Sequence, residues 1–315
     1  MSRDPKSIRI VFMGTPDFAV ASLQALLDGG FNVVGVITAP DKPAGRGLAL
    51  QQSPVKQLAA LHNLPLLQPI KLKDPDFLEQ LAAWKPDLQI VVAFRMLPEA
   101  VWALPPMGTI NLHGSLLPQY RGAAPINWAL INGEQKTGVT TFLLKHEIDT
   151  GDLLLQEEVE IDGRDNFGIL YDKLKTAGAN LLTRTIEQYA QSELIPIPQQ
   201  KIEQSLRAAP KLQKETGAID WNCSAQVINN LIRGLSPIPG AYTMLDGKLL
   251  KIYQATPVEE KSSIPPGNIK TDGKNYLRFA CKDGWLQVEE LQLEGKKRMN
   301  VSSFLQGYRF LTPGD

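Results

Sequence analysis

Two polar residues that could do chemistry together stand two positions apart in a short apolar run. Asn111 and His113 both lie within Ile110–His113. In a β-strand, residues two apart project from the same face, so the amide and the imidazole would be neighbours, while Ile110 and Leu112 would face a helix layer. An imidazole can move protons near neutral pH, and both groups can hydrogen-bond a developing oxyanion. The pair is therefore a candidate for acyl transfer.

A carboxylate is needed to orient such a histidine and to stabilise its charged form. Asp149 is the candidate, because it lies in the turn 148–152, after the expected strand 138–144. A plainer interpretation stands beside this one, since a strand-end histidine is often structural and Asp before Gly is common in turns. We assign the other two histidines to structure: His62 lies at the end of an ordinary helix, and no second histidine follows His146 at the zinc-binding spacing H-E-x-x-H.

The elements that must position these residues alternate along the first two thirds of the chain. Apolar runs typical of strands occupy 8–13, 33–38, 64–67, 88–94, 110–113, 138–144 and 153–161, and helical stretches occupy 16–27, 54–62, 76–84 and 167–190. This alternation indicates a doubly wound, mostly parallel α/β sheet, which binds ligands at the carboxyl ends of its strands. We expect Thr15 to cap the first helix, with Pro16 at the first helical position. The turn at Gly14 lacks the later glycines of a dinucleotide fingerprint, which disfavours a nicotinamide enzyme.

The pattern changes after residue 190. The segment 192–210 contains three prolines and little periodicity, which is typical of a linker. After an expected helix at 225–235, short strands separated by Asp-Gly and Pro-Gly turns indicate a small antiparallel barrel or sandwich. We therefore divide the chain into a first domain at 1–190, a linker at 191–209 and a second domain at 210–315.

Composition bounds the class of protein. The 315 residues are 43% hydrophobic and 21% charged, which is typical of a globular chain with more than one core. No apolar run is long enough to cross a bilayer, and the first residues do not form a signal peptide, so the cytoplasm is expected. Residues 1–205 hold 18 Lys and Arg against 22 Asp and Glu, whereas residues 206–315 hold 15 against 11. The basic second part suggests a polyanion partner, although an excess of this size is common.

The residues around the candidate pair resemble the folate-dependent formyltransferases. The matching stretches are Asn111–Pro118, Tyr120–Ile126 and Asp149–Gly151. The resemblance implies a Rossmann-like formyltransferase domain in which Asn111, His113 and Asp149 are the catalytic residues and no metal is required.

Within that family, the chain is most similar to members whose acceptor is methionyl initiator tRNA. The stretches that carry this similarity are Phe12–Ala19, Pro40–Gly47, Ser53–Lys56 and Pro237–Ala241. The resemblance implies that formyl passes from 10-formyltetrahydrofolate to the α-amino group of methionyl-tRNA for translation initiation. It also implies an OB-like second domain that binds tRNA, and we expect a cytoplasmic monomer without membrane contact.

The resemblance also indicates binding residues. Ser115, Leu116, Leu117 and Pro118 would border the folate site, and Lys42 and Arg46 would contact the tRNA end. Candidate phosphate contacts in the second domain are Lys248, Lys251, Lys296, Lys297 and Arg298, although a solvated surface charge is the commoner role for any one of them. The chain departs from the family at Leu48–Leu50, where lysines are frequent, and at Phe94–Met96, in place of a turn that helps to wall the pterin pocket.

Three other functions stay open from the sequence. A related formyltransferase could act on a small amine, such as a nucleotide sugar or a purine precursor, and a formyl-folate hydrolase could use the same residues to activate water. A protein that only binds tRNA, without catalysis, would give Asn111, His113 and Asp149 no role. The loop at 40–56 and the basic second domain favour tRNA as the acceptor.

Overall fold

The structure is a computed structural model that describes residues 3–44, 49–199 and 206–310. The chain divides into two compact units, which are described separately. The first comprises residues 1–122, 137–160 and 171–208, and the second comprises 123–136, 161–170 and 209–315. Within the described residues, no helix has the length and apolar character required to cross a membrane.

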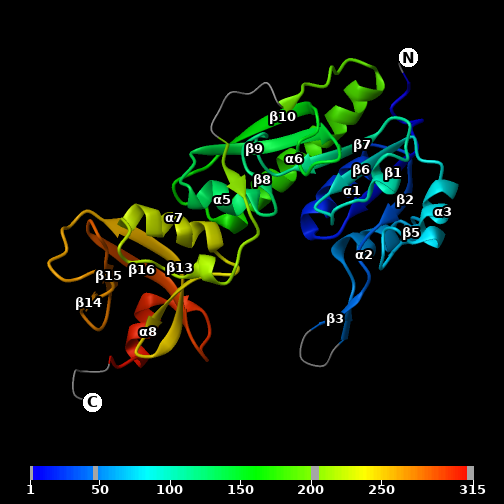
Figure 1. The fold of residues 1–315 in the computed structure, drawn as a ribbon. Helices are drawn as coiled ribbons and strands as arrows, with labels where there is room; N and C mark the ends of the chain where they lie inside the picture. The colour runs from blue at the N-terminus through cyan, green and yellow to red at the C-terminus, as the bar shows by residue number, and fades with distance from the viewer. Residues whose placement is uncertain (1–2, 45–48, 200–205, 311–315) are drawn as a thin grey trace. The chain divides into compact units, whose positions relative to one another are not determined.

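The first unit is built on a seven-stranded sheet with the order β10-β9-β7-β6-β1-β2-β5 (Figure 1). Its strands are β1 (Ile10–Gly14), β2 (Val33–Ile37), β5 (Leu66–Leu67), β6 (Leu88–Val92), β7 (Thr109–His113), β9 (Lys136–Leu143) and β10 (Leu153–Glu160). The pairs β1–β2, β1–β6, β2–β5 and β6–β7 are parallel, whereas β7–β9 is antiparallel. The predicted mostly parallel α/β sheet is therefore confirmed.

Helices accompany this sheet as the periodicity predicts. They are α1 (Asp17–Asp28), α2 (Pro54–Leu61), α3 (Pro75–Ala83), α4 (Glu99–Trp102) and the long α6 (Phe167–Ala190), whose first residues belong to the second unit. Ser53 caps α2 by accepting a hydrogen bond from the Lys56 N–H, and a proline follows the cap. The predicted cap at Thr15 is wrong: Pro16 is extended, so it takes the cap position and α1 begins one residue later.

The loop predicted at 40–56 contains a small hairpin. Its strands β3 (Lys42–Ala44) and β4 (Ala49–Gln51) pair antiparallel, with Lys42 opposite Gln51. Two further short strands, β8 (Arg121–Gly122) and β11 (Ala208–Ala209), lie outside the main sheets. Periodicity did not predict these pieces because strands of two or three residues carry no readable alternation.

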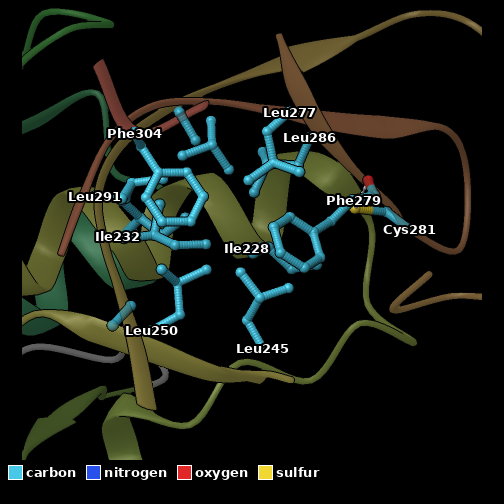
Figure 2. Close-up of a cluster of buried hydrophobic side chains, with 14 of the residues drawn as sticks. Ile228, Ile232, Leu245, Leu250, Leu277, Phe279, Cys281, Leu286, Leu291 and Phe304 are labelled. Atoms are coloured by element: carbon cyan, nitrogen blue, oxygen red, sulfur yellow. Dashed lines mark hydrogen bonds between the residues drawn. The ribbon is translucent and has the colours of Figure 1, made fainter. Parts of the chain in front are cut away.

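The second unit is a half-barrel of antiparallel strands, as expected for an OB-like domain. The strands are β12 (Ala241–Leu245), β13 (Lys248–Val258), β14 (Ile269–Thr271), β15 (Leu277–Ala280), β16 (Trp285–Leu293) and β17 (Met299–Asn300). The helical segments are α5 (Pro125–Ile131), η2 (Glu215–Gly217), α7 (Ala225–Leu235) and α8 (Val301–Gly307). Figure 2 shows Ile228 and Ile232 of α7 pointing into the core formed with the strands, where Phe279 is buried and stacks on Trp221 at 4.4 Å.

Candidate active site

Strand β7 places the amide and the imidazole as the sequence predicts. Leu112 faces α6, because a Cβ added at Gly178 of that helix would lie 2.9 Å from the Leu112 side chain. Asn111 and His113 alternate with Leu112 and so project from the other face of the sheet. His113 is buried at the carboxyl end of β7, and Asn111 is half-buried. Both polar groups therefore stand at the edge where parallel sheets bind ligands.

The two ring nitrogens of His113 have different surroundings. Nε2 lies 2.9 Å from the backbone carbonyl oxygen of Tyr120. Because a carbonyl oxygen only accepts, Nε2 carries a hydrogen, and Nδ1 is the nitrogen at which the ring gains or loses a proton. Nδ1 lies 3.9 Å from Oδ2 of Asp149, which is within ion-pair distance but longer than a hydrogen bond. The structure thus brings together the imidazole and the carboxylate that the sequence singled out.

The turn that carries Asp149 is tightly constrained. Asp149 has a positive φ of 54°, and its Oδ2 accepts a hydrogen bond of 2.9 Å from the backbone N–H of Gly122. A Cβ added at Gly151 would lie 1.6 Å from the carbonyl oxygen of Leu143, so only glycine allows this approach to β9. The Asp149 side chain is 11% exposed, and a backbone N–H holds one of its carboxylate oxygens. It can therefore hold one orientation opposite His113.

The side chain of Asn111 has unused hydrogen-bonding capacity. Across the ranges that the structure describes, no residue forms a hydrogen bond with its amide, and Nδ1 of His113 forms none either. An amide that donates and a nitrogen that exchanges a proton suit an acyl group whose oxygen becomes negative during attack. No group of three His, Cys, Asp or Glu side chains able to hold a metal ion occurs among the same residues.

The four residues predicted to border the folate site form a well-fixed loop after β7. Ser115, Leu117 and Pro118 are buried and Leu116 is half-buried. The Ser115 hydroxyl donates to the Gln119 carbonyl oxygen at 2.6 Å. Because its hydrogen is already used within the loop, the Ser115 hydroxyl has no hydrogen left to donate to a ligand. The folate role of these four residues stays a prediction.

The departure from the family at Phe94–Met96 has a defined structure. Phe94 is half-buried and packs on the core beside β1 and β6, whereas Met96 is 71% exposed. Arg95 donates from Nη1 to the carbonyl oxygen of Ile70 at 2.8 Å and from Nη2 to that of Pro69. Burial lowers the pKa of the Arg95 guanidinium from its ordinary value. Arg95 therefore ties this turn to the segment that follows β5.

A half-buried ion pair fixes the base of the hairpin loop. Lys56 Nζ lies 2.6 Å from Oδ2 of Asp41, and Gln68 donates to Oδ1 of the same carboxylate at 2.8 Å. The hydrogen bond from Lys56, followed by that from Gln68, lowers the pKa of the Asp41 carboxyl. Of the two predicted tRNA contacts in this loop, Lys42 is exposed, and Arg46 lies outside the described residues.

The predicted phosphate contacts of the second unit divide into two kinds. Arg298 bonds the carboxylate of Glu290 and lies over the Tyr253 ring, with 4.3 Å between its Cζ and the ring centroid. Lys251 Nζ donates to the carbonyl oxygen of Pro239 at 2.7 Å. The remaining three are exposed, and their ammonium groups form no ion pair with any residue that the structure describes: Lys248, Lys296 and Lys297.

The sequence does not reveal the groups that support the histidine and the turn of Asp149. These are the carbonyl of Tyr120, the N–H of Gly122 and the side chains of Arg121 and Gln199. The first two are backbone atoms, which leave no signature in a sequence. Gln199 lies in the segment predicted as a linker, where nothing but its position after two prolines distinguishes it.

Comparison with known proteins gives the family to which this chain belongs. The family model described as formyl transferase matches residues 8–186, and the model of the formyl transferase C-terminal domain matches residues 211–309. The chain belongs to the formyl transferase family. It is 53% identical over 310 residues to the methionyl-tRNA formyltransferase of Bacteroides fragilis, covering 96% of both chains. It is 55% identical over 313 residues to that of Parabacteroides distasonis, covering 96% of this chain and 97% of the relative.

Solved structures share the fold at lower identity. WlaRD, a sugar 3N-formyl transferase solved in the presence of dTDP and 5-N-formyl-THF, has a TM-score of 0.66 and 21% identity. The similarity covers 92% of this chain and 99% of WlaRD. HypX from Aquifex aeolicus, in complex with tetrahydrofolic acid, has a TM-score of 0.63 and 19% identity, covering 95% of this chain and 47% of HypX. Identities this low indicate a common fold only.

Proposed function

We propose that the protein transfers the formyl group of 10-formyltetrahydrofolate to the α-amino group of methionyl initiator tRNA. The observation that carries this proposal is identity above 50%, over nearly the full length of both chains, to relatives named methionyl-tRNA formyltransferase. The product would be formylmethionyl-tRNA for translation initiation, and the proposed compartment is the cytoplasm. The predicted division at 1–190, 191–209 and 210–315 and the predicted monomeric state remain part of the proposal.

The reaction forms one bond to the formyl carbon and breaks another. The neutral α-amine attacks the formyl carbon, and the carbon–N10 bond of the folate breaks while N10 takes up a proton equivalent to the one that the amine loses. An α-amino group has a pKa of about 7.7–8.0, so a useful fraction is neutral at physiological pH. The protein has to stabilise a negative oxygen and move one proton.

The site residues have groups suited to both tasks. The Asn111 amide, which has no partner among the described residues, would donate to the formyl oxygen as charge develops on it. The Nδ1 atom of His113 would exchange the proton, because Nε2 is held by the Tyr120 carbonyl. Asp149, at 3.9 Å, would stabilise the imidazolium while the proton is on the ring. Contacts of this kind in a buried site are worth more than in water.

A transfer assay with three acceptor conditions tests the proposal. Purified protein receives labelled 10-formyltetrahydrofolate with methionyl initiator tRNA, with an amino-sugar nucleotide, or with no acceptor. We expect label to appear on the methionyl-tRNA, little on the sugar, and little free formate. Preferential labelling of the sugar would establish a small-amine formyltransferase instead, and formate release without acceptor would establish a hydrolase.

The variants Asn111→Ala and His113→Ala test the assigned roles. Loss of one oxyanion donor typically lowers kcat by about 100- to 1000-fold, and we expect this for Asn111→Ala. We expect His113→Ala to lose at least as much, with unchanged thermal melting and folate affinity. Near-normal turnover in either variant would remove that residue from the mechanism, and a stopped reaction in His113→Ala would exclude a non-catalytic binding module.

A further inference from the structure

The segment after α6 contains a buried amide to which the proposed reaction gives no role. Gln199 is 3% exposed and lies beside the turn of Asp149. Its Oε1 accepts hydrogen bonds from Nε and Nη2 of Arg121 at 3.0 and 2.5 Å. Its Nε2 donates to the carbonyl oxygens of Asp149 and Gly151 at 3.0 and 2.7 Å. Every hydrogen-bonding position of the amide is therefore used.

Only one orientation of this amide satisfies its neighbours. A guanidinium only donates and a carbonyl oxygen only accepts, so Oε1 must face Arg121 and Nε2 must face the turn. A flipped amide would set oxygen against two carbonyl oxygens and nitrogen against a guanidinium. Buried groups without partners each cost free energy, so the arrangement resists change as a unit.

One of the carbonyls that Gln199 holds belongs to the strained residue of the turn. Asp149 is in the left-handed region at φ 54°, a conformation that non-glycine residues adopt at a cost and that persists only when surrounding contacts enforce it. Gln199 bonds the carbonyl of Asp149 itself and that of the residue two positions later. Relaxation of this turn would rotate the Asp149 side chain away from His113.

The chain on either side of Gln199 is anchored to the first unit. Ile197 exchanges two backbone hydrogen bonds with Leu153 of β10, at 2.8 and 2.9 Å. The carbonyl oxygen of Arg207 accepts a bond of 2.7 Å from the N–H of Tyr120, whose own carbonyl holds His113. The segment predicted as a linker thus touches the supports of both the carboxylate and the imidazole.

We propose that Gln199 is a positioning residue that holds the turn of Asp149, and with it the carboxylate that faces His113. Arg121 fixes the orientation of the Gln199 amide from the opposite side. The effect on rate rests on the proposed function, whereas the effect on the position of the carboxylate does not.

Two substitutions distinguish the loss of the amide's hydrogen-bond donors from the loss of its side-chain volume. Gln199→Ala removes all four hydrogen bonds, and Gln199→Glu keeps the size and the contact to Arg121 but cannot donate to the two carbonyls. A displacement of about 1 Å in a reacting group can cost about 100-fold in rate, so we expect kcat to fall by about 10- to 100-fold in both variants. KM for folate and for tRNA should change by no more than about twofold, since Gln199 does not contact either substrate in this scheme.

A matched control comes from the same segment. Gln191 follows α6, is exposed, and forms no side-chain hydrogen bond with any described residue, so Gln191→Ala should retain wild-type kcat. Melting temperatures of the variants report whether the fold survives. A Gln199→Glu protein with wild-type kcat would overturn the proposal, because the donors would then be dispensable.

A double-variant cycle tests whether Gln199 acts through Asp149. If it does, Gln199→Ala should lower kcat by less than about twofold in an Asp149→Asn background, because the carboxylate to be positioned is already gone. Full additivity of the two losses would show that Gln199 supports the site by some other route and would also overturn the proposal.

A structural measurement remains informative if the proposed reaction is wrong. In an NMR spectrum at fixed pH, the ring signals of His113 should shift in Gln199→Ala, whereas those of the exposed His62 and His146 should not. A crystal structure of the same variant should show the Asp149 carboxylate moved away from Nδ1. An unmoved His113 signal and carboxylate would refute positioning, whereas absent formyl transfer by the wild-type protein would refute only the function.

Discussion

At the carboxyl end of β7 the ionisable side chains are enclosed, whereas on the second unit the lysines face solvent. The side chains of His113 and Asp149 are 9% and 11% exposed, and backbone groups fix both. Lys248, Lys296 and Lys297 are exposed and form no ion pair within the described ranges. Electrostatic interactions are several times stronger near a protein interior than in water. One charge beside His113 therefore contributes far more interaction energy than one charge on the surface of the second unit.

This difference separates two ways of using charge. An enclosed pair acts on a few reacting atoms, and the loss of one member changes the rate of a chemical step. An exposed set acts on a polyanion through the sum of its charges, and the loss of one member changes affinity slightly and in a salt-dependent manner. If the comparison is correct, variants of the first region should change kcat and variants of the second should change KM.

Among the variants that remove a charge, Asp149→Asn is expected to have the largest effect. The amide can still accept the hydrogen bond from Gly122, but the negative charge opposite His113 is lost. An opposite charge about 4 Å away is worth up to about 4 kcal/mol at an effective dielectric constant near 20, so we expect kcat to fall by up to about 1000-fold. Single-turnover rates at saturating substrates measure this directly.

Asp152 provides the control for that variant. It lies three positions further on and pairs with Lys145 at 2.7 Å where the lysine is 53% exposed. Exposed pairs contribute about 0–1 kcal/mol, and this one does not face the imidazole, so Asp152→Asn should keep kcat within about twofold. Equal losses in the two variants would mean that enclosure of Asp149 makes no difference, and the comparison would fail.

A smaller effect, on affinity, is expected when the exposed lysines are changed together. The triple variant combines Lys248→Gln, Lys296→Gln and Lys297→Gln. A plot of log affinity for methionyl-tRNA against log salt concentration should become less steep, its slope changing by about 2–3, because each lost phosphate contact contributes roughly 0.7–0.9. At low salt we expect KM to rise on the order of tenfold, with kcat unchanged.

Lysines of the first unit supply a control with the same change of charge. Lys71, Lys73 and Lys85 are also exposed, and their substitution by Gln should leave the salt slope near that of the wild-type protein. If both triple variants give the same slope, the effect is that of net charge alone, and the second unit has no special part in binding tRNA.

The contrast also explains what could be predicted from the sequence. The alternation of Asn111 and His113 with Leu112 follows from strand geometry, and α6 and α7 lie where their periodicity placed them, at Phe167–Ala190 and Ala225–Leu235. Buried elements are readable because the apolar pattern must match the core. The turn after strand 138–144 made Asp149 only one candidate partner for His113, and the family resemblance strengthened that expectation, since the two residues are 36 positions apart.

The supports of the site were not predictable in the same way. Gln199 is separated by 50 positions from Asp149, and its partners there are two carbonyl oxygens, which every residue possesses. The backbone carbonyl of Tyr120, which holds His113, likewise cannot be distinguished in the sequence from any other carbonyl. A Pro-rich segment without periodicity is typical of a linker, and only the tertiary hydrogen bonds show that part of it belongs to the candidate site.

The smallest expected effect distinguishes two neighbours on the second unit. Arg298 is engaged with Glu290 and lies over the Tyr253 ring, whereas the adjacent Lys297 has no such contact among the described residues. Arg298→Gln should therefore change the salt slope by less than Lys297→Gln, whose expected change is about 0.7–0.9. It should instead lower stability by about 0.5–1 kcal/mol through the lost cation–π contact. Salt titrations and thermal melting of the two single variants measure both quantities. An equal change of slope with unchanged melting would show that Arg298 is as available to phosphate as its neighbour.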